Sequence, residues 1–216
     1  MYGVFAFASW IAPSIVVMTG PRICMILAAL TYLFNITQLL YLNKYSVYPA
    51  SVILGIGAPI IWVGQGAFLA NNSNPKTVTR NSGIFWAMNM SSAFAGNAFA
   101  YFLFKDTEFV QKETRMLLGG VLSATTAVGI ACMFLLRPTP WVVKKNEDTF
   151  MSVLKKSWTM ILTKRMLLFS ITLFFTGLNQ AFWGGVYATC VGFTEGYDRL
   201  KSLQTVHYLV LFQNWC

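Results

Sequence analysis

Charged residues are absent from six long apolar stretches of this chain, and that pattern predicts its helices. The stretches cover residues 1–21, 23–43, 45–75, 81–104, 116–136 and 166–194, and none contains Asp, Glu, Lys or Arg. A helix needs about 20 mostly apolar residues to cross roughly 30 Å of hydrocarbon. The pattern therefore predicts six membrane-crossing helices, near residues 2–18, 23–42, 47–69, 83–104, 116–136 and 166–191.

The composition also favours a chain of membrane-crossing helices. Of the 216 residues, 56% are hydrophobic and 11% are charged, and the mean hydropathy is +0.57. In soluble domains about a quarter of the residues are charged. We therefore expect an all-α integral membrane protein, a multi-pass helical bundle whose first partner is the lipid bilayer. The apolar run 206–212 is too short to cross a bilayer, so the tail stays unassigned.

The basic residues predict an orientation. Counting Lys and Arg in alternate loops gives ten on one side and six on the other. Cytoplasmic loops of membrane proteins are enriched in Lys and Arg, so the side with ten, which includes the long segment 137–165, is predicted to be cytoplasmic. The same bias accounts for the basic net charge without a nucleic-acid partner.

Small residues at four-residue spacing predict helix contacts, because close packing holds helices together in lipid. Three helices carry such stripes: Ser92, Gly96 and Ala100; Gly119, Ser123, Ala127 and Ala131; and Gly177, Ala181, Gly185 and Thr189. The helix at 47–69 holds Gly55, Gly57, Pro59, Gly64 and Gly66. Two interpretations stay open for it, a broken helix that lines a cavity and a kinked helix that packs.

Polar amides at membrane depth are the candidate substrate-facing or partner-facing residues, because such side chains are costly in lipid and turn toward the bundle interior. They are Gln65, Asn89, Asn97, Asn179 and Gln180. Asn89 shares a helix face with Ser92 and Gly96. Each amide could equally make an interhelical hydrogen bond that only holds the bundle. The six stretches contain no ionisable residue, which disfavours a proton relay within them.

Enzyme chemistry has little support in the sequence. The single histidine, His207, lies in the tail, and the four cysteines form no CxxC pair. Hydrolase, metalloprotease and P-loop motifs do not occur. We expect no catalytic activity, no cofactor and no metal site.

A set of motif residues resembles a known family. These residues are Trp62, Gln65, Gly66, Arg80, Asn81, Ser82, Gly83, Phe85, Trp86, Gly177, Gly185 and Tyr187. In this order they resemble the uncoordinated-93-like branch of the major facilitator superfamily. The likeness starts at Met1 and runs to about Leu203.

The resemblance implies twelve helices in two six-helix halves, with this chain supplying part of them. Residues 1–136 would hold five helices of the first half, family helices two to six. Residues 137–165 would be the cytoplasmic central loop, 166–192 the first helix of the second half, and 193–216 a divergent tail. The segment Gly20-Pro21-Arg22 stands where the superfamily has a longer gating motif. A partial chain of this kind is expected to be unable to transport by itself.

Proteins of this family include regulatory partners of potassium channels, trafficking chaperones of receptors and orphan transporter-like proteins, so the fold alone does not decide the function. The missing ionisable residues favour an accessory or regulatory partner of another membrane protein, such as an ion channel or receptor. The alternative is a solute transporter with alternating access around a midplane site.

Overall fold

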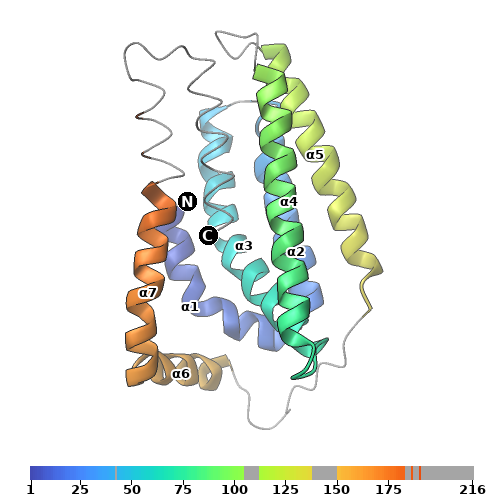
Figure 1. The fold of residues 1–216 in the computed structure, drawn as a ribbon. Coiled ribbons are helices and arrows are strands. Elements are labelled where there is room, and N and C mark those ends of the chain that lie inside the picture. Colours follow the sequence, from blue (N-terminus) through green and yellow to red (C-terminus); the bar gives the residue numbers. More distant parts are fainter. Residues whose placement is uncertain (42, 105–111, 138–149, 183–185, 187–189, 191–216) are drawn as a thin grey trace. The chain divides into compact units, whose positions relative to one another are not determined.

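The computed structural model describes residues 1–41, 43–104, 112–137, 150–182, 186 and 190, and most of these residues are helical. Within them, seven α-helices follow one another, joined by turns (Figure 1). They are α1 (Tyr2–Thr19), α2 (Pro21–Thr37), α3 (Lys44–Asn71), α4 (Val78–Phe104), α5 (Lys112–Leu135), α6 (Phe150–Ile161) and α7 (Lys164–Ala181). The predicted all-α class is confirmed.

Two compact units divide the chain. The first consists of Met1–Ser82 and Gln111–Met160, and the second of Gly83–Val110 and Ile161–Cys216. The first unit thus contains α1, α2, α3, the first turn of α4, α5 and most of α6. The second contains the rest of α4 and α7.

Local sequence explains how several helices begin. Gly20 adopts φ 89° and ψ 146°, and Pro21 follows at the first position of α2. Proline is favoured there because its φ is already helical and its missing N–H would have no partner in the helix. The Asn43 side chain accepts a hydrogen bond from the Tyr45 N–H at 3.1 Å and caps α3.

The first unit is built around α3. It packs most extensively on α2 and then on α1, and α2 also packs on α5. The buried apolar side chains belong chiefly to these helices, with Ala12 and Val16 on α1, Cys24 and Ala28 on α2, and Ala50 on α3. The helices α1, α2 and α3 run in alternating directions, so the turns after α1 and after α2 lie at opposite ends of this unit.

Helices occupy the described residues of all six predicted regions, and their bounds differ from the predicted ones. The helix α2 ends at Thr37, before the predicted residue 42, because the last carbonyls bond three residues ahead in a turn. The helix α4 begins at Val78 instead of residue 83, since Asn74 and Thr77 close a turn that starts it early. The predicted helix 166–191 is described only as far as Phe182, Val186 and Cys190.

The helix α6 was not expected. It lies inside the segment 137–165 that the charge pattern assigned to a polar loop. Its Lys155, Lys156 and three hydroxyl residues lower its hydropathy, so a search for uncharged stretches passes over it.

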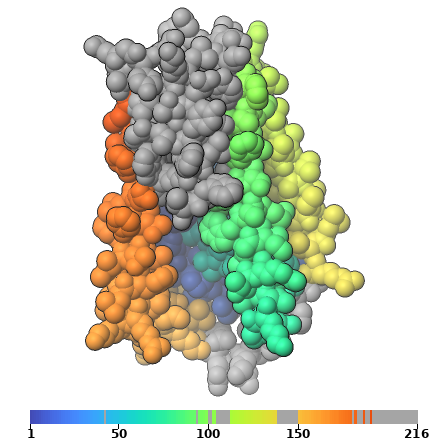
Figure 2. Space-filling model, in the orientation of Figure 1, coloured from blue at the N-terminus to red at the C-terminus, as the bar shows by residue number. Residues whose placement is uncertain are grey.

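Length and composition qualify α1, α3 and α5 as membrane spans, and the interrupted pair α6 and α7 counts as a fourth if it forms one span. The apolar helix α2 has 17 residues, which is short for a span. The helix α4 has the length, but its Asn and Ser side chains reduce its hydropathy. Figure 2 shows the side chains of α5, in yellow, on the outer surface, where Val128 and Phe134 are exposed.

Candidate functional site

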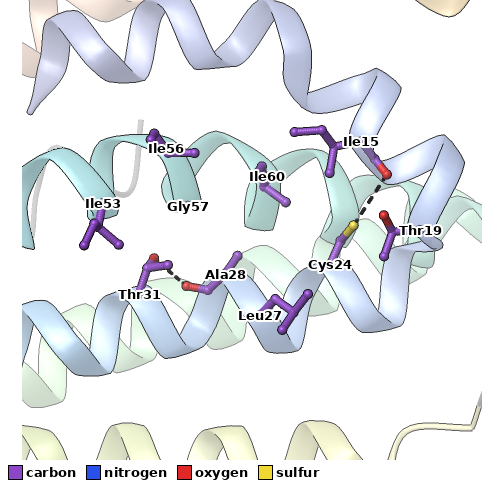
Figure 3. Close-up of a pocket in the computed structure, with 10 residues that line it drawn as sticks. All are labelled: Ile15, Thr19, Cys24, Leu27, Ala28, Thr31, Ile53, Ile56, Gly57 and Ile60. Atoms are coloured by element: carbon purple, nitrogen blue, oxygen red, sulfur yellow. Dashed lines mark hydrogen bonds between the residues drawn. The ribbon is translucent and has the colours of Figure 1, made fainter. Parts of the chain in front are cut away.

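A recess between α1, α2 and α3 is a concave feature of the first unit. Its volume is about 210 Å³. Figure 3 shows its lining, which is Ile15, Thr19, Cys24, Leu27, Ala28, Thr31, Ile53, Ile56, Gly57 and Ile60. Most of these side chains are aliphatic, so the recess is suited to hydrocarbon.

Two of the three polar side chains of the recess donate hydrogen bonds inside the protein. The Cys24 thiol donates to the Ile15 carbonyl at 3.8 Å, and the Thr31 hydroxyl donates to the Ala28 carbonyl at 2.7 Å. The Thr19 side chain lies beside Cys24 in the same recess. Binding sites for polar ligands need a few convergent polar groups, and here the Cys24 and Thr31 donors are already engaged.

The glycines of α3 are contact points with its neighbours. A Cβ at Gly57 would collide with the Thr31 side chain of α2. One at Gly55 would lie 2.9 Å from the Met1 carbonyl oxygen, and one at Gly64 would lie 3.1 Å from the Met25 Cγ. Because α3 continues unbroken from Lys44 to Asn71 through Pro49 and Pro59, the structure supports the packing interpretation of these residues over the broken-helix one.

One of the three small-residue stripes makes a described contact. A Cβ at Gly119 on α5 would lie 3.1 Å from both Leu39 Cβ and Leu40 Cδ2, so the stripe meets the end of α2. Gly96 on α4 and Gly177 on α7 have no atom within 4 Å of a Cβ built on them.

Arg22 lies at the junction of α1 and α2 and reaches the end of α5. Its guanidinium Nη2 donates to the Phe134 carbonyl oxygen at 2.7 Å, in the last turn of that helix. A cation there interacts favourably with the partial negative charge of a helix C-terminus. This basic residue of the shortened gating segment therefore caps a helix.

The candidate amides are placed as follows. Gln65 on α3 is half-buried in the first unit, and Asn89 and Asn97 on α4 are half-buried in the second. Asn179 on α7 is exposed, and the Gln180 side chain lies outside the described residues. That the amides face one interior site stays a prediction.

Several residues of the family motif have clear local roles. The Trp62 indole bonds to the Tyr32 hydroxyl and so ties α3 to α2. The Asn81 amide donates to the Ser73 hydroxyl at 2.9 Å across the turn before α4. The rings of Phe85 and Trp86 meet edge to face at 5.7 Å.

The other motif residues that the structure describes are small or polar. Gly66, Arg80, Gly83 and Gly177 are exposed and Ser82 is half-buried, whereas Gly185 and Tyr187 lie outside the described residues. Within the described part of the chain, no group of three or more His, Cys, Asp or Glu side chains is placed to hold a metal ion.

The recess was missed at the level of sequence, because aliphatic residues in a membrane helix carry no signal of their own. Gly57 was the sign of a close approach within the lining of the recess, as Gly55 and Gly64 were elsewhere on the same helix.

The family model described as ion channel regulatory protein UNC-93 matches residues 1–211. The chain belongs to the UNC-93 family. The match continues past Leu203, so the predicted end of the likeness near that residue is too early.

Three curated relatives support the UNC-93 assignment. The chain is 34% identical over 224 residues to UNC93-like protein MFSD11 of Xenopus tropicalis, covering 94% of this chain and 50% of the relative. Identity to UNC93-like protein 3 of Arabidopsis thaliana is 28%, covering 84% and 43%. Identity to protein unc-93 homolog A of Bos taurus is 26%, covering 98% and 55%.

This UNC-93 chain thus spans about half the length of the curated relatives that it matches. No solved structure matches it. It is a multi-pass integral membrane protein of the major facilitator type, as the apolar helices and the family together show.

Proposed function

We propose that this UNC-93 family chain acts as an accessory or regulatory partner of another membrane protein, such as an ion channel. The family description names ion channel regulation. The chain would act by packing its helices against that protein within the bilayer, since close contact of small and apolar residues drives helix association in lipid.

The apolar recess between α1, α2 and α3 is the observation that carries the proposal. A solute carrier needs polar groups that replace the water around its substrate, whereas the Cys24 thiol and the Thr31 hydroxyl donate to backbone carbonyls of the protein itself. The residues around them are aliphatic. These features favour packing of the first unit against other apolar surfaces over binding of a polar solute.

Solute transport is the second candidate, and one observation favours it. Gln65, Asn89 and Asn97 are half-buried amides in long apolar helices, and polar groups at membrane depth often mark a substrate path. These groups would suit a neutral polar solute such as a sugar or an amino acid. The proposal of a regulatory partner ranks first because the amides also serve as interhelical hydrogen-bonding groups.

Site-specific crosslinking in cells tests the first candidate. A photoreactive amino acid replaces Val128 on α5 or Phe174 on α7, which are exposed, and Val16 on α1, which is buried, serves as the control. We expect a discrete adduct from an exposed position and none from Val16. The crosslinked membrane protein is then recorded electrically with and without this chain, and a change in current or gating is expected.

Liposomes that contain only the purified chain test the second candidate. Saturable uptake of a neutral solute that is lost in Asn89→Leu would replace the regulatory proposal with transport. Equal currents with and without the chain, for every crosslinked channel, would also contradict the regulatory role.

A further inference from the structure

The helix α6 has two chemically different sides. Its apolar residues are Phe150, Met151, Val153, Leu154, Trp158, Met160 and Ile161. With 3.6 residues per turn these fall on about half of the helix circumference. Ser152, Lys155, Lys156 and Thr159 occupy the other half, with the two lysines at its margins, and Ser157 is the one polar residue on the apolar side. This is the pattern of a helix that lies along a membrane surface.

Contacts with α1 hold α6 in place. The rings of Trp10 and Trp158 lie 4.9 Å apart, centre to centre. The Ser14 hydroxyl donates to the Phe150 carbonyl at 3.3 Å. Ser14 lies in the half of α1 nearer the turn with α2, which is on the predicted cytoplasmic side, and Trp10 lies at the middle of α1. Figure 1 shows α6 beside that part of α1.

Much of the apolar side of α6 is not covered by protein. Met151 is 67% exposed, Trp158 53% and Met160 58%. In water these three side chains would form an exposed apolar surface. At the boundary of the bilayer, hydrocarbon covers them instead.

The charge of the segment decides which lipid suits it. Lys155 and Lys156 are exposed on α6, and Lys164 and Arg165 follow where α7 begins. No acidic residue occurs between Phe150 and Ala181 in the sequence. Lysines at the margins of an apolar face can bury their stems in lipid and bring the ammonium to the headgroups.

We propose that α6 is an in-plane helix that binds anionic phospholipid of the cytoplasmic leaflet. Its apolar side enters the acyl-chain boundary and Lys155 and Lys156 bind the headgroup phosphates. Juxtamembrane basic residues gain attraction of this kind from anionic lipid. Through Trp158 and Phe150 the lipid contact is passed to Trp10 and Ser14, so the lipid composition sets how firmly α6 is held on α1.

Hydrogen exchange of the full chain in nanodiscs tests this. Amides of residues 150–161 are followed in phosphatidylcholine alone and in phosphatidylcholine with 30 mol% phosphatidylserine. We expect exchange in the mixed lipid to be slower by about tenfold. The variant Lys155→Gln/Lys156→Gln should lose this difference while keeping the helical circular dichroism of the native chain.

The matched variant is Lys44→Gln/Lys112→Gln, which removes two exposed lysines from the other predicted side and should keep the difference. Equal exchange in the two lipids would overturn the proposal, and so would an equal loss in both variants, because it would show only a dependence on net charge. Slower exchange in phosphatidylcholine on adding millimolar inorganic phosphate would assign the site to a soluble anion instead of a lipid.

Discussion

Single glycines decide how closely the helices of the first unit approach. Gly55, Gly57 and Gly64 on α3 each accommodate a side chain or backbone atom of α1 or α2. Glycine normally weakens a helix relative to alanine, and here the cost is offset by contact area. In lipid the gain from closer helix contact outweighs the cost of glycine, because close packing supplies much of the energy that holds helices together.

Replacing Gly57 by Ala should destabilise the chain, because the new methyl would overlap the Thr31 side chain. We expect a loss of about 1–3 kcal/mol in the free energy of unfolding, which is typical of overpacking. The measurement is denaturant unfolding in detergent micelles, followed by circular dichroism.

The matched control is Gly66→Ala on the same helix, where no atom lies within 4 Å of the new Cβ. It should leave stability unchanged or raise it by up to about 1 kcal/mol. Adding Thr31→Ala to Gly57→Ala should recover part of the loss. Equal stability of Gly57→Ala and the native chain would contradict the contact.

Replacing Arg22 by Gln should loosen the last turn of α5, since the Phe134 carbonyl loses a charged donor. The expected cost is about 0.3–1 kcal/mol, the range for a cation at an exposed helix C-terminus. Hydrogen exchange at residues 133–136 should become faster, while Arg22→Lys should show a smaller effect.

The control for Arg22 is Lys76→Gln, which removes an exposed cation from the turn between α3 and α4. Faster exchange at 133–136 in this control as well would mean that net charge, and not the hydrogen bond, governs the end of α5.

At the scale of helices, the uncharged stretches predicted the positions of α1 to α5 and the start of α7. The ends were less certain, because capping by Asn43 or by the Asn74 and Thr77 turn depends on side chains outside the apolar runs. The helix α6 escaped prediction for a related reason. An interfacial helix carries apolar residues on one side and polar or basic residues on the other. Its sequence is therefore recognised by the helical period of its apolar residues and not by an absence of charge.

Replacing Asn89 by Leu tests whether an amide in the middle of α4 is structural. If Asn89 makes only an interhelical hydrogen bond, the substitution should cost about 0.6–2 kcal/mol of stability. Thermal unfolding of the purified chain measures this. Ser92→Ala serves as the control, because its hydroxyl bonds the Asn89 carbonyl within the same helix at 2.7 Å. A change in channel regulation with unchanged stability would point to contact with a ligand or partner.

At the scale of the whole molecule, contacts within the first unit agree with the grouping of loops by charge. The hydrogen bond from Arg22 to Phe134 joins the turn after α1 to the end of α5, which the charge count put on the same side. Gly119, near the start of α5, meets Leu39 and Leu40 at the opposite end. The sequence predicted that successive loops lie on alternate sides of the membrane. It did not predict which helix faces pack together, because aliphatic side chains can contact lipid or protein equally well.

The orientation in the membrane is a prediction of its own. A cysteine placed at position 146, in a variant that lacks the four native cysteines, should resist an impermeant thiol reagent in intact cells and react after permeabilisation. This position is an asparagine of the segment 137–165, outside the described residues. The variant Tyr41→Cys provides the opposite control and should react in intact cells, whereas labelling at position 146 from outside would show that the predicted orientation is wrong.

Gly20, the one residue between α1 and α2, fixes which face of α2 turns toward α3. Gly20 alone separates Thr19 from Pro21, with a φ of 89° that side-chain-bearing residues rarely adopt. Adding one residue to α2 ahead of Cys24 would rotate the rest of that helix by about 100°. Cys24, Ala28 and Thr31 would then turn away from α3. The number of residues at this turn is therefore as constrained as their type. Related chains should tolerate insertions and epitope tags less well at this turn than at almost any other position.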